Sequence, residues 1–419
     1  MNDMNRHTNI KRRSFLAGGL SLAGAAPVLG GPAALSRWAA SLGSQPAEAG
    51  PQRLVLLQLS GGNDGVSTIV PHGDDAYHAS RKTTRILPGD VLPIDRYRGF
   101  HPRLGSLRGL FDDGHLAIVE GAGYPDPILS HFKCLEVWHT ARHAGRSSGE
   151  GWISRLAEEA WSGNPSTERV VHFGSSVPYS VYSTRHPAIN LESPSAYQFL
   201  GTDAEAKAWA EAGKVGRGSG GREGSGALGR LRKILRDAED TSARIREAAL
   251  AYRTPVEYPD TALAHTLKDV AALIASPLKT RVYSMTYGGF DTHSEQFAAH
   301  NNLMSSLDGV LGAFAKDLTR SEAGRETVVL VFSEFGRRLK ENGSQGHDHG
   351  KAGPMFVLGE RVRGGLYGKH PSLTSLAHGD LEFTTDFRSV YATLIKRWFR
   401  ADDKAVLGRS YPQLDFLRA

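Results

Sequence analysis

Short apolar runs constrain the fold of this chain more than any other feature, and glycine and acidic residues follow them. Each run spans four to seven residues and is followed by a turn-forming stretch. Such a run is typical of a strand that is buried on both faces of a sheet. We identify five of them, at residues 53–59, 115–120, 281–287, 327–332 and 355–358.

Helical patterns lie between these runs, for example at residues 303–318 and 387–398. Strands that alternate with helices predict an α/β fold, with a mainly parallel, doubly wound sheet and helices on both faces. In sheets of this kind, ligands bind beyond the carboxyl ends of the strands. Functional residues are therefore expected just after the apolar runs.

The 419 residues fit one large α/β domain with an insertion. We predict the main domain over residues 50–419. Residues 203–277 are polar and helical in pattern around a stretch with seven glycines at 213–226, which predicts a helical insertion. This stretch contains Gly216-x-Gly218-x-x-Gly221, but no strand precedes it, so we do not interpret it as a dinucleotide site.

The first 49 residues have the order of an export signal. A basic segment is followed by a Gly- and Ala-rich apolar segment and then by the small-residue cleavage pattern Ala47-Glu48-Ala49. Residues 12–16, Arg-Arg-Ser-Phe-Leu, resemble a twin-arginine signal. We therefore expect residues 1–49 to direct export by the twin-arginine translocase to the periplasm, and the mature chain to have no stable membrane span. An ordinary Sec signal and a retained anchor are the alternatives.

The net charge does not indicate nucleic-acid binding. It is +6 for the whole chain, but residues 1–49 hold five basic and two acidic residues, so it falls to +3 without them. A nucleic-acid surface needs a clustered basic patch, and the sequence has none of convincing size. The single cysteine, Cys134, excludes an internal disulfide framework and a thiolate zinc cluster.

Acidic residues and histidines gather after the apolar runs and in one loop between glycines. Each has a plain structural alternative, as a turn residue, a helix cap, a helix-starting acid or part of a solvated loop. In extended backbone, residues i and i+2 project to the same side, so Asp291 and His293 could bind one cation. The candidate metal ligands are Asp64, Asp291, His293, Glu334, Asp348 and His349.

Carboxylates and imidazoles without thiolates suit Zn²⁺, Mn²⁺, Mg²⁺ or Ca²⁺. Six candidate ligands exceed the need of a single ion. We therefore expect one or two divalent ions, which in two-metal sites lie roughly 3.5–4 Å apart.

Ser130 is the candidate nucleophile. Pro125 and Pro127 disfavour a helix before it, and residues 132–140 have helical character. Ser130 is therefore expected at a helix start, where backbone N–H groups bind an anion. The alternative is that Ser130 only caps the helix.

Several motifs together resemble the bacterial domain of unknown function family 1501. They are the twin-arginine motif, residues 58–65 (Gln-Leu-Ser-Gly-Gly-Asn-Asp-Gly), 130–132 (Ser-His-Phe) with Trp138, 288–293 (Gly-Gly-Phe-Asp-Thr-His), 332–337 (Phe-Ser-Glu-Phe-Gly-Arg), 346–350 (Gly-His-Asp-His-Gly) and 385–391 (Thr-Asp-Phe-Arg-Ser-Val-Tyr). That family resembles the alkaline phosphatase and sulfatase superfamily. The resemblance implies an alkaline-phosphatase-like fold.

The resemblance also implies roles for individual residues. Asp64 looks like the first metal-binding acid and Ser130 like the nucleophile. Asp291 and His293 resemble the Asp/His pair, Glu334 stands where an Asp is usual, and His349 looks like the last His. Two departures are evident: Asp291 and His293 are unusually close in sequence, and an imidazole is missing after the fourth run unless His131, His347 or Asp348 replaces it.

Two functions from different classes follow. The first is an exported metal-dependent hydrolase of phosphate or sulfate esters, acting on a small molecule or a polymer, with Lys351 or Arg337 as further anion contacts. The second is a non-catalytic envelope protein that uses a phosphatase-like fold for binding or assembly. A Ser-His-Asp esterase is disfavoured because the sequence has no G-x-S-x-G motif.

Overall fold

The computed structural model describes residues 52–143, 149–162, 167–197 and 240–418. The predicted export signal and residues 198–239 of the predicted insertion lie outside this part of the chain. In the described part, no helix is both long and apolar enough to cross a membrane.

A nine-stranded sheet forms the centre of the structure, with the order β13-β5-β12-β9-β1-β8-β6-β7 and β14 beside β5. All five predicted strands are present in it, and the prediction of a mainly parallel sheet is confirmed. Only β12 runs antiparallel, to β5 and β9. The strands are β1 (Arg53–Leu59), β5 (Leu116–Gly123), β6 (Val170–Phe173), β7 (Ile189–Leu191), β8 (Val282–Tyr287), β9 (Thr327–Phe332), β12 (Gly353–Leu358), β13 (Gly365–Gly368) and β14 (Thr385–Asp386).

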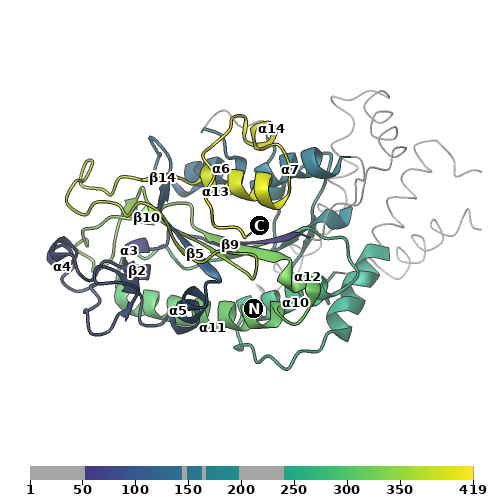
Figure 1. Ribbon diagram of the computed structural model, residues 1–419, viewed down its shortest axis with the longest axis horizontal. Coiled ribbons are helices and arrows are strands. Elements are labelled where there is room, and N and C mark those ends of the chain that lie inside the picture. The colour runs from purple at the N-terminus through teal and green to yellow at the C-terminus, as the bar shows by residue number, and fades with distance from the viewer. Residues whose placement is uncertain (1–51, 144–148, 163–166, 198–239, 419) are drawn as a thin grey trace, which may run out of the picture.

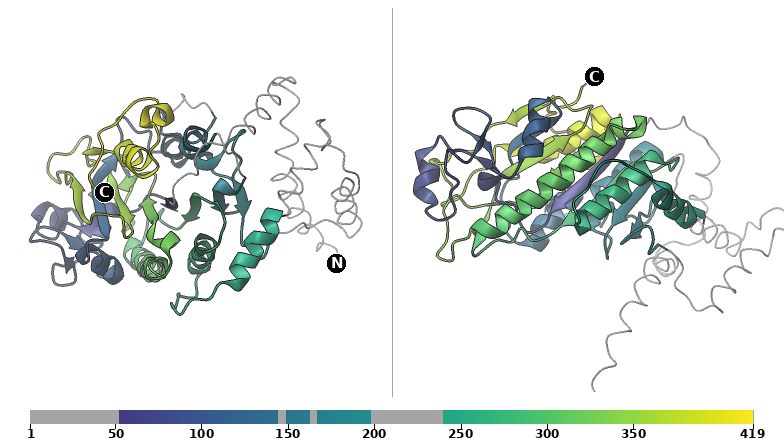
Figure 2. Two further views of the ribbon diagram at one scale, coloured as in Figure 1. Left: turned by 45° about the vertical axis from the view of Figure 1, so that its right-hand side comes forward. Right: turned by 90° about the horizontal axis from the view of Figure 1, so that it is seen from below.

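Helices cover both faces of this sheet (Figure 1). One face carries α6 (His131–Thr140), α7 (Trp152–Trp161), α13 (Arg388–Thr393) and α14 (Asp403–Leu407), with the π-helical turn η4 (Leu394–Trp398) continuing α13. The other face carries α5 (Gly105–Asp112), α10 (Ala262–Ala275), α11 (Gln296–Leu318) and α12 (Glu322–Arg325). Figure 2 shows α11 lying along the length of the sheet.

Side chains of each central strand alternate between two apolar cores. In β1, Leu54 and Leu56 pack into the core on the α6 side, whereas Val55, Leu57 and Leu59 pack on the α11 side. This period of two is what a strand covered on both faces requires. Each such side chain stabilises the fold by about 1.5–3 kcal/mol when it is fully buried.

A smaller unit lies at one end of the sheet. It contains α3 (Gly65–Thr68), α4 (Asp75–Ser80) and the three-stranded sheet β2-β4-β3, formed by Ile69–Val70, Gly99–Phe100 and Leu92–Pro93. The short hairpin of β10 (Gly336–Arg337) and β11 (His349–Gly350) lies between β9 and β12. The 3-10 turns η2 (Thr167–Arg169) and η3 (Tyr179–Val181) complete the described elements.

The antiparallel direction of β12 decides where the candidate residues meet. Strands β1, β5, β8 and β9 all point the same way, so their carboxyl ends share one edge of the sheet. Because β12 is reversed, its beginning lies at that edge, and the His-Asp-His segment directly before it lies there too. The segments that follow β1, β5, β8 and β9 are therefore brought together with the segment that precedes β12.

The described part of the predicted insertion joins the main domain. Residues 240–251 are helical, and α10 follows them. Leu267, Val270 and Leu273 of α10 are fully buried in the core on the α11 side. This helix is therefore part of the layer that covers the sheet.

Candidate metal centre

Four side chains converge at the shared edge of the sheet. Asp291 and His293 follow β8, His349 begins β11, and His131 begins α6. Single ligand atoms of His131, Asp291 and His349 all lie within 4.8 Å of one another. His293 Nε2 lies 3.1 Å from Asp291 Oδ1, and His349 Nε2 lies 3.3 Å from the same atom. We call these four residues the histidine cluster.

Each imidazole of the cluster is held through its Nδ1 atom. His131 Nδ1 donates to Glu334 Oε1 at 3.0 Å, and His349 Nδ1 donates to the backbone carbonyl of Leu129 at 2.9 Å. His293 Nδ1 faces Asp348 Oδ1 at 3.4 Å. Because these partners only accept hydrogen bonds, the proton of each neutral ring is assigned to Nδ1. The Nε2 lone pairs are then left to face the interior of the cluster, as in metal-binding histidines.

Two of these nitrogens lie so close together that a proton or a metal ion must lie between them. His293 Nε2 and His349 Nε2 lie 3.0 Å apart, and both are close to the carboxylate of Asp291. Two lone pairs at this distance repel unless a proton or a metal ion lies between them. Burial lowers the pKa of His349, which disfavours the proton on that ring. The residues present therefore fit a divalent ion.

Arg337 fixes the carboxylate of the cluster. Its guanidinium is fully buried and donates to Asp291 Oδ1 at 2.6 Å. It also donates to the carbonyls of Gly61, Gly62, Phe290 and His347, and so ties together the segments after β1 and β8 and the one before β12. Arg337 is fully buried and all three of its nitrogens donate to protein oxygens, so it is not accessible to a substrate anion, contrary to the expectation from the sequence. Burial opposes ionisation of Asp291, but the Arg337 hydrogen bond and charge lower its pKa, so the carboxylate is ionised at neutral pH.

Glycines permit the close approach of the segments that carry the cluster. A Cβ atom on Gly61 would lie 2.3 Å from the backbone nitrogen of Asp291, and one on Gly346 would lie 2.2 Å from the carbonyl carbon of His293. Gly61 also has φ of +119°, a conformation that L side chains rarely adopt. These two positions explain why glycines flank the candidate residues in the sequence.

The sequence matches the model of a family described as "Protein of unknown function (DUF1501)" over residues 120–408. The chain belongs to this family. The matched range contains the whole histidine cluster and Glu334, whereas Asp64 lies before it. No curated protein matches the sequence.

Solved structures with a similar fold come from the alkaline phosphatase and sulfatase group. One is a protein in the alkaline phosphatase superfamily from Vibrio parahaemolyticus, with a TM-score of 0.40 and 10% identity over 95% of this chain and 78% of that chain. Another is a sulfatase from Pseudoalteromonas sp., with a TM-score of 0.39 and 9% identity over 92% of this chain and 75% of that chain. These similarities concern the fold alone.

The six predicted metal ligands divide into three in the cluster, two next to it, and Asp64, which lies apart from it. Asp291, His293 and His349 come together in the cluster. Glu334 and Asp348 do not face the interior of the cluster. Their carboxylates instead contact the Nδ1 atoms of His131 and His293, respectively. The Glu334 carboxylate is fully buried and also accepts the backbone N–H of Gly61 at 2.8 Å.

His131 is the cluster residue that the ligand prediction did not include. The sequence offered it only as one of three replacements for a missing imidazole, and the structure places this one in the cluster. The second, His347, instead contacts the Thr84 hydroxyl through Nε2 at 2.9 Å and the Arg338 carbonyl through Nδ1 at 3.0 Å. The signal that could have selected His131 is its position next to Ser130, at the helix that follows β5.

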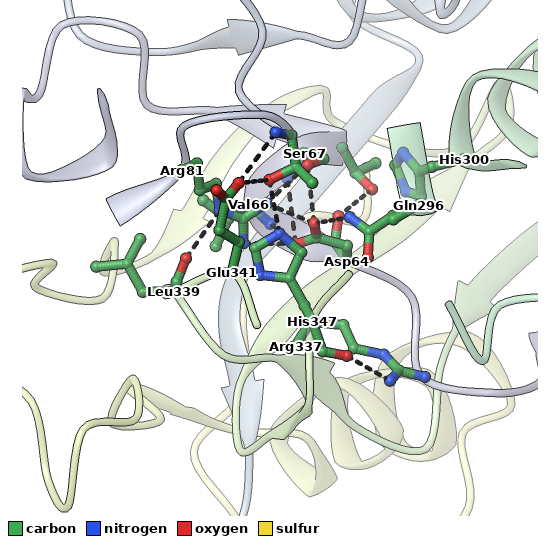
Figure 3. A network of polar contacts seen from close by, with 12 residues as sticks. Asp64, Val66, Ser67, Arg81, Gln296, His300, Arg337, Leu339, Glu341 and His347 are labelled. Atoms are coloured by element: carbon green, nitrogen blue, oxygen red, sulfur yellow. Dashed lines mark hydrogen bonds and ion pairs between the residues drawn. The ribbon is translucent and has the colours of Figure 1, made fainter. Parts of the chain in front are cut away.

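Asp64 lies outside the cluster, in a buried polar network (Figure 3). It forms an ion pair with Arg81, with Oδ2 2.5 Å from Nη1 and Oδ1 3.0 Å from Nη2. Neither side chain of the pair is exposed to solvent. Asp64 also caps α3 by accepting the N–H groups of Val66 and Ser67, as a turn residue would. Burial opposes its ionisation, but the charge of Arg81 holds the pKa of Asp64 well below its usual value.

Ser130 lies between two residues that contact the cluster. It is the N-cap of α6, as predicted, but its side chain makes no capping hydrogen bond. Its neighbour Leu129 binds His349 through the backbone carbonyl, and its other neighbour is His131. The half-buried Ser130 therefore belongs to the segment that forms one wall of the cluster.

Proposed function

We propose that the protein is a metal-dependent hydrolase of phosphate or sulfate esters. The convergence of three imidazole Nε2 atoms on one carboxylate, each ring held from behind through Nδ1, is the observation that supports this proposal. About half of the Asp291 side chain and 44% of the His293 side chain are exposed, so a substrate has access from solvent. An ion held by all four side chains of the cluster would take a substrate oxygen as a fifth ligand, as catalytic zinc sites sometimes do.

The donor set favours some ions over others. Three imidazoles and one carboxylate suit Zn²⁺ or Mn²⁺, whereas Mg²⁺ and Ca²⁺ prefer oxygen ligands. A divalent ion held here supplies charge that polarises an ester oxygen and stabilises the developing negative charge. His131, His293, His349 and Asp291 are the residues that would hold it.

Ser130 and the start of α6 act on the rest of the substrate. The first N–H groups of a helix have no partners within the helix, so the start of α6 can bind the non-bridging oxygens of a phosphate or sulfate group. Ser130 Oγ loses its proton and forms a bond to phosphorus or sulfur as the ester alcohol leaves and takes up a proton. Water then cleaves the new bond and regenerates the serine.

Hydrolysis of a substrate panel tests the proposal. Protein loaded with Zn²⁺ or Mn²⁺ is assayed on aryl and alkyl phosphate and sulfate esters, and on phosphonate monoesters. We expect turnover that is lost in Ser130→Ala while the bound metal is retained. The matched control is Ser193→Ala, because Ser193 lies on an exposed turn that does not contact the cluster.

The alternative function predicts a different result. If the metal-loaded protein is inert on every ester of the panel, the non-catalytic binding or assembly role is supported instead. The structure offers one observation in favour of this alternative. Among the described residues, no side chain that could accept the proton of the Ser130 hydroxyl is hydrogen-bonded to it.

Export remains part of the proposal. The motif Arg12-Arg13-Ser14-Phe15-Leu16 supports delivery to the periplasm by the twin-arginine translocase. Replacement of both arginines by lysine is expected to retain the full-length chain in the cytoplasm, as measured by cell fractionation. Unchanged export of the variant contradicts this route.

A further inference from the structure

The carboxylate of Asp64 has no free position for a metal ion. Its Oδ2 atom accepts from Ser67 Oγ at 2.8 Å, Arg81 Nη1 at 2.5 Å and Gln296 Nε2 at 2.5 Å. Its Oδ1 atom accepts from Arg81 Nη2 at 3.0 Å and from the N–H of Val66 at 3.2 Å, with the N–H of Ser67 at 3.4 Å. A carboxylate has about four lone-pair positions, so these donors saturate it.

The imidazoles around Asp64 are also committed to protein partners. His347 is held at both ring nitrogens, by Thr84 and by the Arg338 carbonyl. His300, which is buried, contacts the side-chain oxygen of Asn63 through Nε2 at 3.2 Å. Figure 3 shows both rings beside the ion pair of Asp64 and Arg81. The group has the residue types of a metal site, but its cation is a guanidinium.

Arg81 is a permanent cation in this place. Its side chain is fully buried, and it also donates to the carbonyls of Leu339 and Arg338 at 3.0 and 3.2 Å. A guanidinium stays protonated throughout the pH range in which proteins fold. A divalent ion bound to Asp64 would therefore have to displace Arg81 and leave a buried charge without a partner, which is strongly unfavourable.

We propose that the protein binds a single divalent ion, at the histidine cluster, and that Arg81 neutralises Asp64 in place of a second ion. This inference rests on the proposed function, because it assumes that the cluster is a metal site. Arg81 is then a positioning residue, because it fixes the segment after β1. In that segment, the N–H of Gly61 donates to Glu334, and the carbonyls of Gly61 and Gly62 accept from Arg337.

Counting bound ions tests the inference. Metal-free protein is titrated with Zn²⁺ by calorimetry, and the ions that remain after desalting are measured by elemental analysis. We expect one ion per chain in the wild type, at least a tenfold lower occupancy in His349→Ala, and one ion per chain in Asp64→Asn. Asp415→Asn, which removes an exposed carboxylate paired with Arg363 and Arg397, is the matched control.

Two further measurements cover the case in which Asp64→Asn does not fold. Ser67→Ala removes one donor to Asp64 without changing a charge, and its ion count is expected to stay at one. Wild-type protein loaded with Mn²⁺ is expected to give the paramagnetic resonance spectrum of isolated ions, without coupling between two.

The outcomes separate the two proposals. Two ions per chain, a coupled Mn²⁺ spectrum, or the loss of an ion in Asp64→Asn contradicts the single-ion inference and leaves the proposed function intact. No ion in the wild type contradicts both.

Discussion

The buried carboxylate of Glu334 accepts a hydrogen bond from Nδ1 of His131 at 3.0 Å, although the two residues are 203 positions apart in the sequence. The bond joins the segment after β9 to the start of α6. It fixes the tautomer of His131, and it directs Nε2 towards Asp291 Oδ2, 3.5 Å away. The geometry of the histidine cluster thus depends on a carboxylate that does not itself face the interior of the cluster.

Replacing this carboxylate is expected to weaken metal binding. Glu334→Gln removes the negative charge behind His131, and the loss of such a partner typically lowers metal affinity by about 10- to 100-fold. Asp348→Asn is the matched comparison, because Asp348 is 56% exposed and its contact with His293 is longer, at 3.4 Å. Zn²⁺ affinity measured by competition with a chelator should fall much further in the first variant. Equal losses contradict the role given to Glu334.

A methyl group at Gly346 is expected to disturb the cluster. Its Cβ would lie 2.2 Å from the carbonyl carbon of His293, so the backbone that carries this ligand has to shift. Gly343 lies three residues earlier, and nothing lies within 4 Å of a Cβ placed there. Gly346→Ala should therefore lower Zn²⁺ affinity and thermal stability, whereas Gly343→Ala should leave both near the wild-type values. A Gly346→Ala variant with unchanged affinity is incompatible with this packing.

The ion pair of Arg81 and Asp64 is expected to be essential for folding stability. Arg81→Met leaves a buried carboxylate without its cation, and breaking a buried pair in this way costs about 3–5 kcal/mol. Arg363→Met breaks an exposed pair with Asp415 and should cost less than about 1 kcal/mol. The free energy of unfolding in urea measures both. Similar values for the two variants would show that Arg81 is not needed.

Buried neutral histidines predict a loss of stability in mild acid. Burial, helped by the neighbouring His172, lowers the pKa of His139 from 6.5 to about 4. The unfolded chain therefore binds a proton that the folded chain rejects as the pH falls from 6.5 to 4, and the free energy of unfolding decreases across this window. At about 1.4 kcal/mol per pKa unit, His139 accounts for roughly 3 kcal/mol of this decrease.

His139→Gln tests the contribution of His139 to this decrease in the free energy of unfolding. A glutamine amide can still donate to Gln58, which His139 Nε2 contacts at 2.7 Å. The variant should lose less stability than the wild type between pH 6.5 and pH 4, as measured by urea unfolding at several pH values. Parallel curves for the two proteins would contradict the lowered pKa.

The sheet and part of the histidine cluster could be predicted because their signals are local. Continuous apolar runs such as residues 327–332 are typical of strands covered on both faces, and the spacing of Asp291 and His293 is visible in the sequence. The carboxyl ends of parallel strands share an edge, so Asp291 and His293 could be placed at the same edge as Ser130 and Glu334 without knowledge of side-chain contacts. The position of His349 at this edge depends on the reversed direction of β12.

The remaining features depend on contacts that leave no local pattern. Arg81 follows a short helix in an irregular segment, and nothing near it in sequence shows that it neutralises Asp64. His131 reaches the cluster because Glu334 and the end of β5 place it there. The reversed direction of β12 is likewise a matter of topology, and an apolar run has the same composition in either direction.

A crystal structure of protein grown with Zn²⁺, with data collected on the high-energy side of the zinc absorption edge, tests the metal centre most directly. We expect one anomalous peak about 2.0–2.2 Å from the Nε2 atoms of His131, His293 and His349 and from the carboxylate of Asp291. The ion pair of Asp64 and Arg81 should remain intact beside it. No peak within the histidine cluster, or a peak bound by Asp64, would contradict the assignment.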